Sequence, residues 1–231
     1  HFFSQSAFAP LNTASKEFYL SEDEKLTVAL INLARYNPRV FIQEIIGKSD
    51  LDTTQPEIIE LLVRLRNQKS TFPLMPAFSL FKSALVHSKD MGNSGNAGHK
   101  GSDGKSFKER IGQYFSAPTA FAENYYQGSG EPADVVIQML SGIGEFGPKY
   151  RENLLSSELH YIGISIQPHR TKCTNAVLDF AQKPQITASN GTRKREKTEV
   201  YWRDCPTGTK VDSPRKSGGF SFGSLFGSRH K

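Results

Sequence analysis

The residue types that could carry chemistry gather between Gly98 and Asn124. This segment places His99 and Asp103 among closely spaced glycines, and Glu123 follows after a short predicted helix. Glycine weakens helices and strands and favours tight turns, so the stretch around His99 is predicted to be a loop. Imidazole and carboxylate groups together suit Zn²⁺ or another divalent cation. The loop is therefore a candidate metal or ligand site.

A structural explanation covers part of the same segment. Asp103 could cap the helix that follows the loop, and Ser106 with Glu109 fits a Ser-x-x-Glu capping box. Capping is the favoured interpretation of Ser106 and Glu109. It leaves the histidine and the later glutamate of the segment unexplained.

The composition favours one sizeable hydrophobic core with tails. The 231 residues are 37% hydrophobic, which is enough for one sizeable core. No run approaches the roughly 18 apolar residues of a membrane span, so no transmembrane segment is expected. The net charge of +6 is concentrated late in the chain. The first residue is His1, which is consistent with a processed secretory precursor or with a trimmed chain.

Two further features bear on the compartment. Cys173 and Cys205 could form one disulfide or could be two unrelated thiols, and their spacing does not decide between these alternatives. Two cysteines cannot form a four-cysteine zinc site, so a metal would have to use histidine and carboxylate ligands. Asn190 begins an Asn-Gly-Thr glycosylation sequon, which weakly favours a secreted protein.

The periodicity of apolar residues predicts helices first and strands later. The pattern predicts helices that begin near Ser21, Gln55, Ser79, Phe107 and Pro132. Segments 160–166 and 176–181 read as an antiparallel hairpin whose turn contains Cys173. This order predicts an α+β fold with helices packed on a small antiparallel sheet. His87, at helical spacing from apolar neighbours, is interpreted as a buried, hydrogen-bonded core histidine.

The predicted division of the chain has three parts. Residues 1–20 are expected to be an extended N-terminal arm, and residues 21–184 are expected to form the domain. Residues 185–231 are rich in Ser, Gly, Lys and Arg, which is typical of a flexible basic extension.

A set of short motifs in a fixed order resembles the CAP superfamily. The superfamily comprises cysteine-rich secretory proteins, antigen 5 and pathogenesis-related 1 proteins, and the match is closer to its cysteine-poor, SCP-like branch. The resemblance covers roughly residues 22–183 and rests on the following segments: Leu30–Arg35, Pro73–Pro76, His87–Met91, Gly98–Gly104, Arg110–Ile111, Ala122–Asn124, Arg151–Leu155 and Tyr161–Ile164.

The resemblance implies a three-layer α-β-α sandwich, usually secreted, with a cleft that holds two histidines and one or two glutamates. His99 matches the first cleft histidine, and Glu123 matches the glutamate of a Gly-Glu-Asn motif that here begins with Ala122. Tyr150 stands where the second histidine is expected, and a neutral phenol is a poor zinc ligand. Asp103 belongs to the same candidate cleft.

A metal site would therefore start from two protein ligands, His99 and Glu123, fewer than the three of a catalytic zinc centre. His160 or Glu145 could supply a third ligand, although the family pattern places none there. The alternative is a metal-free polar cluster in which His99, Glu123 and Tyr150 form hydrogen bonds. The cluster is slightly favoured.

Three functions stay open from the sequence. The first is a secreted, non-enzymatic module that binds a lipid, a sterol or a protein partner and requires no cofactor. The second is a divalent-metal-dependent hydrolase, with Glu123 as general base and His99 as metal ligand or acid-base partner. The third is binding of anionic surfaces by the basic extension, and nucleic acid is not the expected partner.

Overall fold

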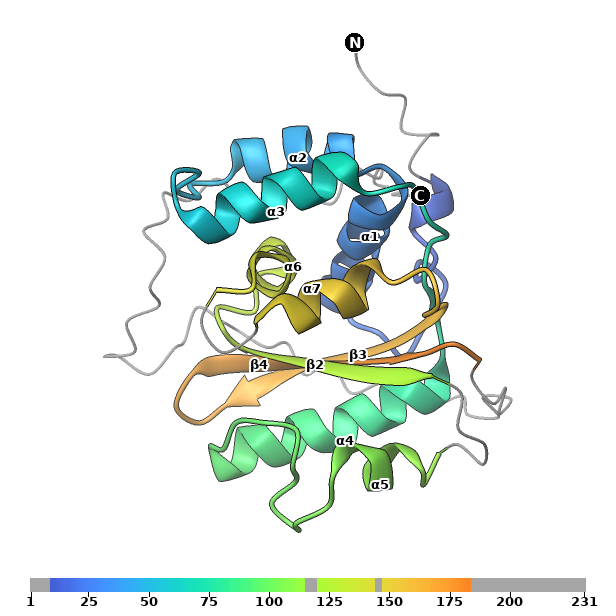
Figure 1. Ribbon diagram of the computed structural model, residues 1–231. Coiled ribbons are helices and arrows are strands. Elements are labelled where there is room, and N and C mark those ends of the chain that lie inside the picture. The colour runs from blue at the N-terminus through green and yellow to red at the C-terminus, as the bar shows by residue number, and fades with distance from the viewer. Residues whose placement is uncertain (1–8, 115–119, 144–146, 184–231) are drawn as a thin grey trace, which may run out of the picture.

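The computed structural model describes residues 9–114, 120–143 and 147–183 (Figure 1). The predictions for Glu145, Asn190, Cys205 and the basic extension concern residues outside these ranges. The elements are, in chain order, η2 (Ala9–Leu11), α1 (Glu22–Tyr36), α2 (Pro38–Glu44), η3 (Ile46–Lys48), α3 (Pro56–Asn67), β1 (Met75–Pro76), α4 (Phe78–Ser94), α5 (Phe107–Ile111), β2 (Phe121–Gly128), α6 (Pro132–Ser141), α7 (Gly147–Leu155), β3 (Tyr161–His169) and β4 (Cys173–Ala181).

The sheet forms the middle of three layers. Its strand order is β1-β3-β4-β2, so β2 is an edge strand. Helices α4 and α5 cover one face, and α1, α6 and α7 lie on the other, with α2 and α3 outermost (Figure 1). The predicted α-β-α sandwich is confirmed. The predicted antiparallel sheet is correct for β2, β4 and β3, but the two-residue strand β1 pairs with β3 in parallel.

The capping signals in the sequence set the ends of the first helices. Ser21 and Glu24 form the predicted capping box at the start of α1. The second carboxylate oxygen of the buried Glu24 accepts a hydrogen bond from the backbone N–H of Ile166, at 2.9 Å, which ties α1 to β3. Asn37 ends α1 and caps α2, where Pro38 occupies the first turn.

Three predictions about local structure need correction. Helix α4 begins at Phe78, near the predicted position, but Ser79 lies inside its first turn and the N-cap is the extended Ala77, which donates its N–H to the carbonyl of Ile162. Residues 9–20 do not form an extended arm, since Leu11 and Ala14 are buried in the core. The segment that contains Glu123, for which no strand was predicted, forms the whole of β2.

Helix α4 lies unusually close to the sheet at Gly163. A Cβ atom at this position would lie 2.1 Å from the carbonyl carbon of Leu80 and 2.2 Å from the nitrogen of Phe81. Only glycine therefore allows this approach. Gly163 faces Asp179 across the β3–β4 ladder, so the close contact brings the buried side of α4 over the centre of the sheet.

None of the helices in the described ranges is both long and apolar enough to cross a membrane.

Candidate functional site

Two carboxyl groups lie side by side on the α4-facing surface of the sheet. Glu123 of β2 and Asp179 of β4 are direct partners in the antiparallel register, so their side chains leave the sheet on the same face. Asp179 is completely buried and Glu123 is 5% exposed. A pair of neighbouring buried carboxyl groups forms the floor of the site.

A hydrogen-bonded chain connects Glu123 to Tyr150 through His99. His99 Nδ1 lies 2.8 Å from Glu123 Oε1, and the Tyr150 hydroxyl lies 3.0 Å from His99 Nε2. A carboxylate can only accept, so His99 donates from Nδ1 and its Nε2 accepts a hydrogen bond from the Tyr150 hydroxyl. These hydrogen bonds therefore join the loop after α4, the edge strand β2 and helix α7.

The asparagines of the two family motifs hold α7 in position for this contact. Asn124, the next residue on β2, donates from Nδ2 to the carbonyl of Tyr150 at 3.0 Å. Asn153 donates from its own Nδ2 to Asn124 Oδ1 at 2.8 Å. Both asparagines are buried. Because β2 is the edge strand, Tyr150 can reach His99 past that edge from the opposite layer.

Arg110 closes the cluster from helix α5. Its Nη2 forms an ion pair with Glu123 Oε2, and its Nη1 donates to the carbonyl of His99 at 3.3 Å. The predicted capping box of Ser106 and Glu109 is present and sets the start of α5. Helix capping and the candidate site are therefore parts of one arrangement, in which the cap orients the helix that carries Arg110.

His87 is buried, as predicted, but it also belongs to the cluster. Its Nε2 lies 2.8 Å from the carbonyl of Gly98, to which it donates, and 4.0 Å from Glu123 Oε1. Burial, and next the positive charge of Arg110, lower the pKa of His87 to about 4. His87 is therefore neutral at physiological pH and fixes the start of the glycine-rich loop.

The carboxyl pair holds a proton at neutral pH. Burial raises the pKa of Glu123 to about 7, and the ion pair with Arg110 opposes this rise. Burial and the adjacent Glu123 raise the pKa of Asp179 well above its usual range. Glu123 receives hydrogen bonds from the cationic Arg110 and from His99, whereas Asp179 has only the Ser83 hydroxyl and Glu123 itself within hydrogen-bonding reach. The proton therefore lies on Asp179.

His99 is the part of the cluster that solvent reaches, since its side chain is 47% exposed. Partial burial and then Arg110 lower the pKa of His99, so the ring is neutral near pH 7. The ring of Tyr125 contacts both His99 and Tyr150, with centroids 5.1 and 5.9 Å away. The cluster can hold together the loop after α4, strand β2 and helix α7. Its one solvent-accessible group is the His99 imidazole, both of whose nitrogens form hydrogen bonds within the protein.

The remaining candidates lie elsewhere. Asp103 is exposed and forms an ion pair with Lys105 at 2.7 Å, so the structure does not bring it into the cluster. His160 is exposed and contacts the carbonyl of Ser157. Neither residue supplies a third metal ligand.

The donors of the cluster fit a divalent cation poorly. Both nitrogens of His99 and both carboxylate oxygens of Glu123 already have hydrogen-bond or ion-pair partners. Within the described ranges, no group of three or more His, Cys, Asp or Glu residues is arranged to hold a metal ion. Zn²⁺ would have to displace Tyr150 or Arg110, and it would then find fewer than three ligands.

Sequence reasoning missed the parts of the cluster that depend on strand register. Asp179 carries no local motif, and only its pairing with Glu123 reveals it. Ser83, whose hydroxyl lies close enough to lower the pKa of Asp179, was also missed. Arg110 was visible as part of the motif pattern, but nothing in the sequence indicated that it faces Glu123.

Comparisons with known proteins agree with this architecture. The model of the cysteine-rich secretory protein (CAP) family matches residues 59–180, more than half of the chain. No curated protein matches the chain significantly.

Two solved structures show low similarity. An extracellular protein containing an SCP domain from Bacillus anthracis str. Ames is 18% identical, with a TM-score of 0.40 over 55% of this chain and 38% of that one. An outer surface protein from Borrelia burgdorferi is 20% identical, with a TM-score of 0.43 over 58% of this chain and 96% of that one. The chain thus spans well under half of the Bacillus protein. By its matching family model, the chain belongs to the CAP family of cysteine-rich secretory proteins.

Proposed function

We propose that this chain is a secreted CAP-domain protein that acts by binding a ligand or partner and not by catalysis. The observation that carries the proposal is the closed hydrogen-bond chain from Tyr150 through His99 to Glu123. A metal ligand or a general base needs a lone pair directed at the metal or the substrate. Here the lone pairs are taken up inside the protein.

Tyr150 is the residue that changes the character of the cleft. A histidine at this place would offer a ring nitrogen to a cation also bound by His99, whereas the Tyr150 hydroxyl donates a hydrogen bond to His99. The consequence is structural cohesion between β2, α7 and the loop after α4. We therefore assign the cluster a positioning role and place ligand recognition elsewhere on the domain.

Calorimetric titration of the metal-stripped protein with Zn²⁺ tests this assignment. We expect no saturable binding to the natural chain at neutral pH. Tyr150→His should create saturable binding, because His99, Glu123 and the new imidazole would then make three ligands. Tyr150→Phe is the matched control: it removes the hydrogen bond to His99 without adding a nitrogen, and it should show no saturable Zn²⁺ binding.

Saturable Zn²⁺ binding to the natural chain that disappears in His99→Ala would overturn the proposal. It would favour the second candidate, a metal-dependent hydrolase that uses His99 and Glu123. The ion pair between Glu123 and Arg110 argues against that candidate, because it neutralises the general base that the hydrolase would need.

The ligand class is proposed from the family, as a lipid, a sterol or a protein partner. Secretion is supported by family membership, by the Asn190 sequon and by the two cysteines, of which Cys205 lies outside the described residues. Fluorescence titration with a sterol probe at low and high salt separates binding in a groove of the domain from binding through the basic extension. Groove binding should barely respond to salt, whereas binding through the basic extension should fall steeply.

A further inference from the structure

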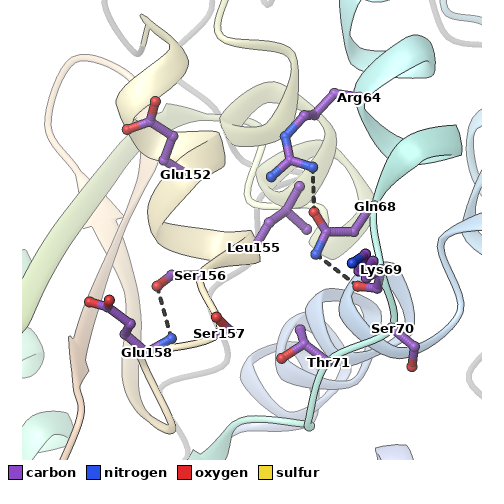
Figure 2. A pocket seen from close by; sticks show the side chains of 10 residues that line it. All are labelled: Arg64, Gln68, Lys69, Ser70, Thr71, Glu152, Leu155, Ser156, Ser157 and Glu158. Carbon is purple, nitrogen blue, oxygen red and sulfur yellow. Dashed lines mark hydrogen bonds between the residues drawn. The ribbon is translucent and has the colours of Figure 1, made fainter.

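A polar pocket lies between the end of α3 and the segment that joins α7 to β3 (Figure 2). It shares no lining residue with the His99 cluster, although helix α7 contributes to both. Its volume is about 520 Å³, within the range of ligand sites in proteins. The lining consists of Arg64, Gln68, Lys69, Ser70, Thr71, Glu152, Leu155, Ser156, Ser157 and Glu158.

The two walls of the pocket are held by a buried guanidinium. Arg35, with no exposed surface, donates to the carbonyls of Leu154 at 2.7 Å and Leu159 at 2.9 Å. Its Nε donates to the carbonyl of Phe72 at 3.1 Å, and Phe72 follows Thr71, the last residue of the opposite wall. An ion pair between Arg151 and Glu60 also joins α7 to α3. The pocket is therefore preformed.

The walls carry opposite charges. Figure 2 shows Arg64, Gln68 and Lys69 on one side and Glu152 and Glu158 on the other. Neither Lys69 nor Glu158 forms an ion pair with any described residue. Lys69 and Glu158 thus place one charge of each sign, without an ion-pair partner among the described residues, on the two walls, whereas Glu152 pairs with Lys149 at 3.7 Å.

The chemistry of the lining narrows the ligand. Leu155 is its only apolar residue, so the pocket does not suit an acyl chain or a sterol. It contains no aromatic ring on which a sugar could stack. A purely anionic ligand would meet the two glutamates, and a purely cationic one would meet Arg64 and Lys69. A molecule with a positive group at one end and a negative group at the other avoids both penalties.

We propose that this pocket binds a short peptide with oppositely charged ends, its ammonium group facing Glu152 and Glu158 and its carboxylate facing Arg64 and Lys69. The hydroxyl groups of Ser70, Thr71, Ser156 and Ser157 supply donors and acceptors for the peptide backbone between the ends. The inference rests on the proposed binding role of the domain, and it names the partner as a peptide.

Nuclear magnetic resonance titration of the full chain with triglycine tests this inference. We expect saturable shifts of the backbone amides of Ser70, Thr71, Ser156 and Ser157. N-acetyl-triglycine lacks the ammonium group and triglycine amide lacks the carboxylate. Each should bind about two- to fivefold more weakly than triglycine, the effect of losing one solvent-exposed ion pair.

Charge-removing variants assign the two ends. Glu158→Gln should weaken the binding of triglycine and leave the binding of N-acetyl-triglycine unaffected. Lys69→Gln should weaken the binding of triglycine and leave the binding of triglycine amide unaffected. Glu57→Gln, at the opposite end of α3, and Lys89→Gln, on α4, remove the same charges away from the pocket and should change nothing.

Two results would overturn the inference: no shifts at millimolar triglycine, or equal affinity for all three peptides. Either result leaves the proposed non-catalytic role intact. Appearance of free glycine signals during the titration would mean that the protein cleaves the peptide, and it would overturn the proposed function separately from the pocket.

Discussion

At position 150, one side chain decides what the cleft can do. Tyr150 is buried, and its side chain offers a hydroxyl donor where the expected histidine would offer a nitrogen lone pair. His99 then has a donor on one side and an acceptor on the other. The cleft residues therefore satisfy one another's hydrogen bonds and leave no nitrogen of His99 for a cation.

The first prediction concerns the contribution of His99 to stability. His99→Ala removes the donor to Glu123 Oε1 in a place where the Glu123 side chain is 1% exposed. An unsatisfied buried acceptor costs about 1–3 kcal/mol, so we expect urea unfolding to show a loss of that size. Tyr150→Phe should cost less, because water can reach His99 Nε2. An unchanged unfolding curve for His99→Ala would show that the cluster is not structural.

The second prediction concerns Asp179 and pH. Its folded pKa lies above its usual value of 3.8, so the folded state binds more protons than the unfolded state above that pH. Stability from this group is therefore present at low pH and is lost as pH rises through the folded pKa. Asp179→Asn removes the titration, so the stability of the variant relative to the natural protein should rise between pH 5 and pH 8.

Urea unfolding of both proteins at each pH gives this difference. His87, whose pKa is lowered to about 4, contributes a slope of opposite sign between about pH 4 and the ordinary histidine pKa of 6.5. His87 is present in both proteins, so its contribution largely cancels. A stability difference that is constant from pH 5 to pH 8 would mean that Asp179 is ionised in the folded protein.

The residues of the cluster differ in how far the sequence reveals them. Motif order and spacing identified His99, Glu123 and Tyr150, because these residues lie in short motifs that resemble those of the family. Asp179 and Ser83 have no such pattern, and their place depends on strand register and on the angle of α4. Neither of these can be read from residue types alone.

At the scale of elements, α4 and the sheet form the central contact of the fold. Helix α4 carries Ser83 and His87 on its buried side, and both side chains lie at the carboxyl pair. The close approach at Gly163 allows this arrangement. The geometry of the site is thus set by a residue that carries no side chain.

The third prediction tests this contact. In Gly163→Ala the new Cβ would meet backbone atoms of Leu80 and Phe81, which cannot move independently of α4. We expect a loss of stability of about 1–3 kcal/mol or more in urea unfolding. Gly47→Ala, whose Cβ would meet only the carbonyl oxygen of Ile42 at 3.3 Å, is the control and should cost much less.

Helices with caps were predictable as elements, and the edge strands were not. Ser21, Ser106 and Pro132 mark helix starts where the structure has them. Strand β2 combines Glu, Asn and Gln with aromatic residues, so it lacks the apolar alternation that identified β3 and β4. Glu123 and Asn124 are polar and yet buried because they belong to the site, and this breaks the apolar alternation by which a strand is predicted.

Charge is distributed very unevenly over the whole molecule. Residues 184–231 contain ten Lys or Arg and four Asp or Glu, so they account for the entire net charge of +6. Residues 1–183 are consequently neutral overall. Long-range attraction to anionic surfaces must come from the C-terminal residues, whereas the domain offers only local charges such as those of the peptide pocket.

The last prediction separates these two sources of binding. Replacing Arg193, Lys194, Arg195 and Lys197 by Gln in the full chain removes four positive charges. Each Lys or Arg near an anionic membrane contributes about 1 kcal/mol, so binding to phosphatidylserine-containing vesicles at low salt should fall by at least about tenfold. Co-sedimentation with phosphatidylcholine vesicles and at high salt gives the baseline, since screening removes the attraction. Triglycine binding should be unchanged in the variant. Equal vesicle binding by both proteins would exclude these four residues as the anionic-surface site.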